Sequence, residues 1–148
     1  MNVARKQVSH AIFALLQSVY QFRKTELDLR GLGHVDAEEQ PYLGLVRPRT
    51  SATQQKAFGL TIWELQYVGV VYMRKDATQL APGVYWQDFL DDIEDTIDKA
   101  FQPATVGTPN TLNGLVTNCW IEGDIEIDPG ILDQQIAMFI PIKVLTGI

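Results

Sequence analysis

The sequence predicts an α+β fold: a largely antiparallel, twisted sheet of about five strands, two helices packed on one face, and a long hairpin arm. Two segments place apolar residues at the three- and four-residue spacing of amphipathic helices. Other segments alternate apolar and polar residues, or are rich in β-branched and aromatic residues, as strands are. The predicted strands mostly follow one another in hairpin-like succession, which favours an α+β domain.

Length and composition predict one domain, residues 1–148. A chain of this length buries roughly 68–70% of the surface that its unfolded form exposes, so a core forms without disulfide or metal crosslinks. Hydrophobic residues make up 46% of the chain and charged residues 20%, and these ordinary values exclude a disordered or fibrous protein. The only cysteine, Cys119, has strand-like neighbours and is expected to be a small buried hydrophobe.

The first 46 residues predict a helix and two strands. Apolar residues recur at helical spacing from Val8 to Phe22, and Asn2 is the expected N-cap. Thr25–Leu29 alternates as a short strand does, and glycines end it. A proline then opens the second strand, Tyr42–Val46.

Residues 47–73 predict a long hairpin. Arg47–Ala57 contains nothing to bury, so we expect an exposed arm with a mobile tip. Phe58–Met73 carries the strongest strand pattern and predicts one long, bent strand, with Gly69 as a candidate bulge. The basic residues of the arm that we expect to contact a partner are Arg47, Arg49 and Lys56.

The second helix is predicted over Tyr85–Phe101, and Pro103 ends it. A polar loop, Pro103–Asn113, follows. The apolar stripe of this second helix comprises Trp86, Phe89, Ile93, Ile97 and Ala100. Its opposite face comprises Asp88, Asp91, Asp92, Asp95 and Asp98.

The last third of the chain predicts two more strands. Leu115–Asp128 alternates strictly, and Gln134–Leu145 follows a turn. Pro141 lies inside the final strand, and proline cannot donate to a strand ladder, so we expect an edge strand or a bulge there. The candidate edge residues are Phe139, Pro141 and Lys143.

The charges are divided unevenly along the chain. The net charge of −6 argues against a protein that grips nucleic acid, which needs a basic surface. Residues 1–75 carry ten basic and six acidic groups, a net +4, whereas residues 76–148 carry two basic and twelve acidic groups, a net −10. Such asymmetry can make a folded surface bipolar and favour head-to-tail association, or folding can intersperse the two halves.

No pattern predicts an enzyme. Phosphate-binding loops, nucleophile elbows and metalloprotease motifs are missing, and the only possible partners for Cys119 are His10 and His34. The acidic helix could be considered for a hard cation, but its carboxylates lie opposite the apolar stripe, as on a solvated face. We therefore expect no catalytic residues, no metal site and no cofactor.

A second acidic row lies on the strand Leu115–Asp128. Successive side chains on one side of a strand are about 6.8 Å apart. Because the side chains of this row are acidic, they cannot face a core. A solvated sheet face explains the row, and so does the wall of a pore through which a polyanion slides without sticking. The row comprises Glu122, Asp124, Glu126 and Asp128, and the first three are the candidate lumen residues.

Targeting segments are not evident. Arg5 and Lys6 precede an apolar patch, Ala11–Leu16, but the patch has six residues and no small-residue cleavage site follows. No apolar run approaches the length of a membrane span. We expect a protein without membrane contact that stays where it is made.

Two parts of the sequence resemble a known family. One is Ala11-Ile12-Phe13-Ala14-Leu15-Leu16 with Glu39-Gln40-Pro41-x-Leu43-x-Leu45. The other, more specific, runs over residues 114–128 (Gly-Leu-Val-Thr-Asn-Cys-Trp-Ile-Glu-Gly-Asp-Ile-Glu-Ile-Asp) and continues to Ile140-Pro141-Ile142-x-Val144-Leu145. These residues are similar to those of the small tail terminator, or tail completion, proteins of bacteriophages, and the acidic helix sits where that family places its second helix.

The resemblance implies a virion structural protein of the phage neck. Such proteins form a hexameric ring that caps the tail tube, ends its polymerisation and offers a docking surface to the head connector, while genomic DNA passes through the lumen. The implied partners are other copies of the chain, the tail tube protein and the connector or stopper protein, and the implied location is the tail–head junction after assembly in the host cytoplasm. A stopper or head–tail joining protein of the same neck is the alternative, and a monomeric acidic binding module is an alternative of another class.

Overall fold

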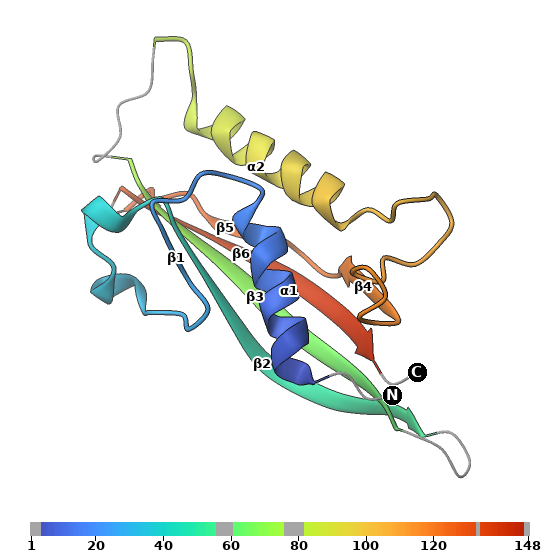
Figure 1. The fold of residues 1–148 in the computed structure, drawn as a ribbon. Helices are drawn as coiled ribbons and strands as arrows, with labels where there is room; N and C mark the ends of the chain where they lie inside the picture. Colours follow the sequence, from blue (N-terminus) through green and yellow to red (C-terminus); the bar gives the residue numbers. More distant parts are fainter. Residues whose placement is uncertain (1–3, 56–60, 76–81, 133, 147–148) are drawn as a thin grey trace.

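The computed structural model describes residues 4–55, 61–75, 82–132 and 134–146 and has two layers, a sheet and a pair of helices (Figure 1). Along the chain, helix α1 precedes three strands, helix α2 follows them, and three further strands end the chain. Two short 3-10 helices, Leu32–His34 and Ala37–Glu39, lie between β1 and β2. The bounds are α1 Arg5–Gln17, β1 Lys24–Glu26, β2 Tyr42–Gln55, β3 Thr61–Arg74, α2 Trp86–Phe101, β4 Asn118–Ile121, β5 Glu126–Asp128 and β6 Gln135–Thr146.

The six strands form one mixed sheet in the order β1-β2-β3-β6-β4, and β5 also pairs with β6. Only β1 and β2 are parallel; the pairs β2–β3, β3–β6, β4–β6 and β5–β6 are antiparallel. The predicted α+β class with a largely antiparallel sheet is therefore confirmed. The sheet has six strands rather than about five because the segment predicted as one strand, Leu115–Asp128, forms two short strands, β4 and β5, that lie end to end along β6.

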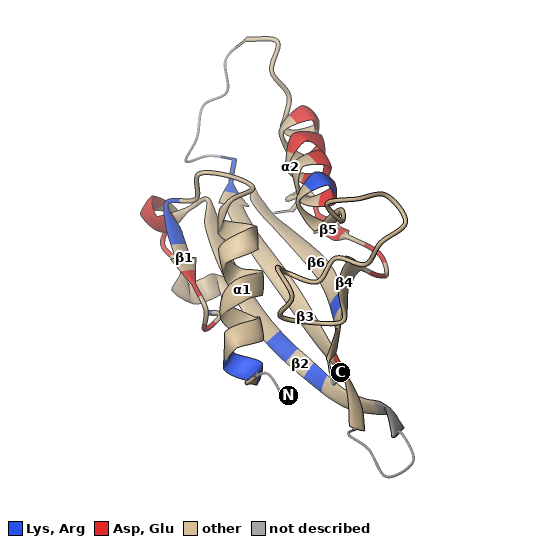
Figure 2. Ribbon diagram, turned by 45° about the vertical axis from the view of Figure 1, so that its right-hand side comes forward, with Lys and Arg blue, Asp and Glu red and all other residues tan. Residues whose placement is uncertain are grey.

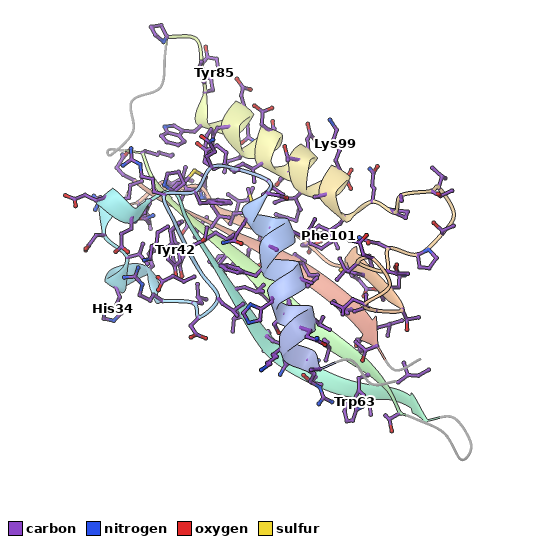
Figure 3. The ribbon with its side chains drawn as sticks, viewed as in Figure 1. His34, Tyr42, Trp63, Tyr85, Lys99 and Phe101 are labelled. Carbon is purple, nitrogen blue, oxygen red and sulfur yellow. The ribbon has the colours of Figure 1, made fainter. Side chains whose placement is uncertain are left out.

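Both helices pack on the same face of the sheet, as predicted (Figure 1). On α2 the buried residues are Leu90, Ile93, Ile97 and Phe101, so the apolar stripe of the helix faces the strands. Figure 3 shows Phe101 directed toward the sheet and Lys99 directed away from it. The fully buried residues of this core from α1 and the strands include Ile12, Leu16, Leu43, Leu65, Val71, Ile136, Met138, Ile140 and Val144.

The long hairpin is confirmed, but most of its arm is strand. Residues 47–55 continue β2 and pair with β3 as far as Gln55 opposite Thr61. Pairing with a neighbouring strand satisfies the backbone, so this polar segment needs no side-chain burial to be ordered. Lys56 and Ala57, with the predicted mobile tip, lie outside the described residues.

The predicted bulge at Gly69 is wrong. The register runs unbroken through Gly69, which lies opposite Leu45 and Ile140. The irregularities are in β2, between Val46 and Arg49 and again further along the strand. A Cβ atom on Gly69 would lie 3.0 Å from Cδ1 of Leu16, so the glycine allows α1 to approach the sheet closely.

Two boundaries of the first segment also differ from the prediction. The N-cap position of α1 is Ala4, without a side-chain cap, and Asn2 lies outside the described residues. The helix ends at Gln17, although Val19 is buried and Phe22 packs against the core. Apolar spacing therefore continues beyond the helix because the chain that follows crosses the same core.

The prediction of an edge strand at Phe139, Pro141 and Lys143 is wrong. β6 is an interior strand, paired with β3 on one side and with β4 and β5 on the other. The carbonyl of Pro141 accepts the Glu122 N–H at 3.3 Å, which turns its ring nitrogen toward the break between β4 and β5. The proline is accommodated because the neighbouring strand, rather than β6, is interrupted where a donor is missing.

The segment between β1 and β2 crosses to the other face of the sheet and covers one end of it. Val35, with Leu29 and Leu32, packs there against Tyr42 and Tyr72, whose rings stack at 5.5 Å. Arg30 holds this segment together because its guanidinium forms ion pairs with both Glu26 and Glu39. The Arg30 N–H also donates to the Tyr42 hydroxyl at 3.2 Å.

The Arg30–Glu39 ion pair predicts a pH dependence of stability. Hydrogen bonds from Arg30 hold the pKa of Glu39 below its usual range. A lowered folded-state pKa stabilises the fold above the unfolded value of about 4.3 and loses that contribution as the pH falls through the lower folded value. The urea midpoint of the wild type should therefore fall between about pH 5 and about pH 3, and Glu39→Gln should show a flatter profile over that window.

Glu38→Gln is the matched control for this measurement. It removes an adjacent exposed carboxylate that makes no ion pair with any described residue, and it should keep the wild-type profile. Equal pH profiles for wild type and Glu39→Gln would show that the ion pair does not couple folding to protonation.

Candidate functional site

Beyond the segment that holds Val35, no described helix or strand covers the sheet face opposite the helices. Residues directly opposite each other in register project from the same face. Val46 and Phe139 are each 38% exposed there, and Pro141, which lies opposite Val68, is half-buried on the same face. We call this surface the open face; its central residues are Val46, Val68, Phe139, Pro141, Arg49, Gln66, Lys143 and Trp120.

The acidic row lies along the margin of the open face. Glu126 is opposite Phe139 and Asp128 is opposite Ala137, so both project from that face. Asp124 is exposed in the segment that joins β4 to β5. All four carboxylates of the row are exposed, and Ile121, Ile125 and Ile127 between them pack against the core, which confirms the predicted alternation.

Lys143 partly neutralises the row. Its Nζ donates to Glu122 at 2.6 Å and lies 3.4 Å from Glu64, and the hydrogen bond to Glu122 is the main reason that the pKa of Lys143 is raised. Asp128 accepts the backbone N–H of Gly130 at 3.0 Å. Asp124 and Glu126 form no ion pair with a described residue, so the margin keeps net negative charge.

The two described arginines of the arm lie together in β2. Arg47 and Arg49 are both exposed, while Lys56 lies outside the described residues. Figure 2 shows them as two blue bands in the middle of β2, at the same end of the molecule as the start of α1. The fold thus brings the arginines of the arm near the basic residues at the start of α1, which are far away in the sequence.

A hollow of about 600 Å³ lies between the start of α1, residues 27–29 and β2. We call it the basic groove, after Arg5, Lys6, His10 and Arg47, which line it with Asp28 as the only acid. Uncharged residues complete its lining: Ser9, Leu27, Leu29, Leu45, Val46 and Tyr67.

The groove has an ordered wall. Ser9 Oγ and the Tyr67 hydroxyl are 2.8 Å apart, which ties α1 to β3, and the Arg5 guanidinium lies 4.9 Å from the centroid of the Trp63 ring. Sequence reasoning missed this site because Arg5 and Lys6 are far from Arg47 in the sequence and come close to it only in the folded chain. The net +4 of residues 1–75 was the available indication.

The acidic face of α2 consists of Asp88, Asp91, Asp92, Asp95 and Asp98, all exposed. None of them forms an ion pair with a described residue. Partial burial and the neighbouring charges of Asp91 and Asp95 raise the pKa of Glu94, as expected for a helix whose negative charge is not compensated. Over the described ranges, no three His, Cys, Asp or Glu side chains are grouped as metal ligands.

Cys119 lies in β4 and is 1% exposed, which confirms the predicted buried cysteine. Burial raises the pKa of its thiol to about 12, so the nucleophilic thiolate is not formed at neutral pH. His10 and His34 are both exposed, and neither hydrogen bonds to Cys119. The chemistry of a Cys–His pair is therefore not assembled by these residues.

No helix in the described parts of the chain is long and apolar enough to cross a membrane. No family model matches the sequence, and no curated protein matches it.

The burial of Cys119 predicts slow thiol modification. A thiol-specific reagent should label the native protein at least about a hundredfold more slowly than the urea-unfolded protein at the same pH, because the thiol is both inaccessible and protonated. The measurement is the time course of absorbance with a chromogenic disulfide reagent. Native labelling as fast as that of the unfolded chain would contradict the buried position.

Proposed function

We propose that the protein is a virion structural component of a phage neck, a tail terminator that forms a hexameric ring on the end of the tail tube. In this role it ends tube polymerisation and presents a docking surface to the head connector, and double-stranded DNA passes through the ring. Two independent supports are the sequence resemblance at residues 11–16 and 114–128 and the arrangement of the sheet.

The observation that carries the proposal is the open face with its acidic margin. Both helices cover one side of the sheet, and none of the described segments covers the centre of the other side. In a ring, this is the side that would line the lumen, with Glu122, Asp124 and Glu126 along it. Asp124 and Glu126, which form no ion pair with a described residue, would repel the phosphate backbone of DNA, so the wall would let the duplex slide without binding it.

The projecting hairpin supplies a second surface for assembly. The far end of the β2–β3 hairpin, where Gln55 pairs with Thr61, extends beyond the last β3–β6 pair, Trp63 opposite Thr146 (Figure 1). Arg49 lies on the open face before that end. A paired hairpin keeps its direction without further contacts, so it suits docking to an adjacent ring better than a loose loop would.

The first test is assembly on tube ends. Purified protein mixed with tail tubes should cap them with rings that are visible by negative-stain microscopy, and capped tubes should stop elongating when tube protein is added. A stopper or joining protein would bind the connector and leave tube ends free, so parallel mixtures with connector separate the two neck roles. A protein that stays monomeric and binds neither structure would overturn the proposal in favour of a monomeric binding module.

The second test addresses the lumen. The variant Glu122→Lys/Asp124→Lys/Glu126→Lys, here the row variant, should still form rings and virions. Its particles should deliver DNA more slowly, by about tenfold or more at low ionic strength, because basic side chains hold phosphates. DNA release is measured by dye fluorescence after triggering ejection in vitro, and release at the wild-type rate would exclude these residues from the DNA path.

A further inference from the structure

Two surfaces of opposite charge remain without a role in the proposed ring. One is the basic groove, with Arg5, Lys6 and Arg47 at its rim. The other is the acidic face of α2, with five exposed aspartates on a helix of 16 residues. Neither set forms ion pairs with the described residues, so each would gain a partner from a second molecule.

The two surfaces lie at opposite sides of the molecule. The groove is at the β2 side of the sheet, and α2 packs over β4, at the other edge. Figure 2 shows the red bands of α2 at one end and the blue bands of α1 and β2 at the other. Contacts between two different surfaces of identical subunits are head-to-tail contacts, and they close into a ring when the rotation between neighbours allows it.

We propose that the basic groove of one subunit binds the acidic face of α2 from a second copy of this chain, and that this contact joins neighbours in the ring. The groove of about 600 Å³ is an open hollow with cations at its rim and apolar residues within it. A helix that presents carboxylates over about three turns is complementary to such a site in charge. The assignment rests on the ring-forming function proposed above.

The acidic row is a weaker partner for the groove. Lys143 already pairs with Glu122, and Asp128 already accepts a backbone hydrogen bond, which leaves Asp124 and Glu126 unpaired. On α2, Asp91 accepts a hydrogen bond from Gln87 and Asp98 accepts one from Gln102, but none of its five aspartates forms an ion pair with a described residue. Assigning α2 to the subunit contact also leaves the row free to line the lumen.

A charge exchange between two variants tests the contact. The groove variant is Arg5→Glu/Lys6→Glu/Arg47→Glu, and the helix variant is Asp91→Lys/Asp92→Lys/Asp95→Lys. Each variant alone brings like charges together at the contact, so self-association should weaken at least about tenfold. An equal mixture should restore rings of alternating subunits, because every groove then meets a helix of opposite charge.

The readouts are sedimentation velocity at several concentrations and salt levels, with negative-stain images of the products. The row variant is the matched control: it has the same change in net charge as the helix variant but on the open face, and it should associate like the wild type. Circular dichroism and urea midpoints of each variant verify the fold. Wild-type association should itself weaken as salt is raised, because exposed charges are screened.

The outcomes separate this inference from the proposed function. The inference would be overturned if the groove variant or the helix variant formed rings alone. It would also be overturned if the mixture failed to associate although both variants were folded. Neither result would contradict tube capping by the wild type. Conversely, charge-exchange behaviour in a protein that never binds tube ends would support the contact and reject the terminator role. A wild type that does not associate under any condition, on tubes or alone, would overturn both.

Discussion

The structure depends on the pairing of β3 with β6. Their register runs without interruption over twelve residue pairs, from Trp63 opposite Thr146 to Arg74 opposite Gln135. Twelve consecutive pairs determine which side chains face the helices and which face the other way, since a shift of one residue would exchange the two faces. Leu65, Val71, Met138 and Ile140 then form the floor on which α1 and α2 pack.

The same pairing explains why the second half of the chain is arranged as it is. β6 is interior, and its outer edge must be covered, because unpaired N–H and C=O groups in a sheet are costly to bury and prone to pairing with other chains. A single long strand could not satisfy that edge at Pro141, which has no N–H to offer. Two short strands with a break between them satisfy the residues on each side of the proline, and the break is where Gly123 and Asp124 reach the margin of the open face.

Local sequence patterns were sufficient to predict most helices and strands, but they did not predict which elements lie next to each other in the fold. The stripe of α2 and the alternation around Ile125 predicted which face packs against the core, because period and orientation are linked directly. The stripe left out two residues that are buried, Leu90 and Phe101. The edge position of Phe139, Pro141 and Lys143 was wrong, because strand order depends on which segments meet in space. The basic groove was missed for the same reason: Arg5 and Arg47 are 42 positions apart in the sequence and come together only when α1 packs across β2 and β3.

Strand order also decides what becomes of the uneven charge. β1, β2 and β3 come from the half of the chain with net charge +4, and β6, β4 and β5 come from the half with net charge −10. The order β1-β2-β3-β6-β4 keeps the halves on separate sides of the sheet, so among the described strands they pair with each other only at β3–β6. Folding therefore preserves the division instead of interspersing it, with α1 on the basic side and α2 on the acidic side (Figure 2). When the basic side of one subunit attracts the acidic side of another, the subunits associate head to tail. A closed ring is the arrangement in which every subunit makes both contacts and no end is left open.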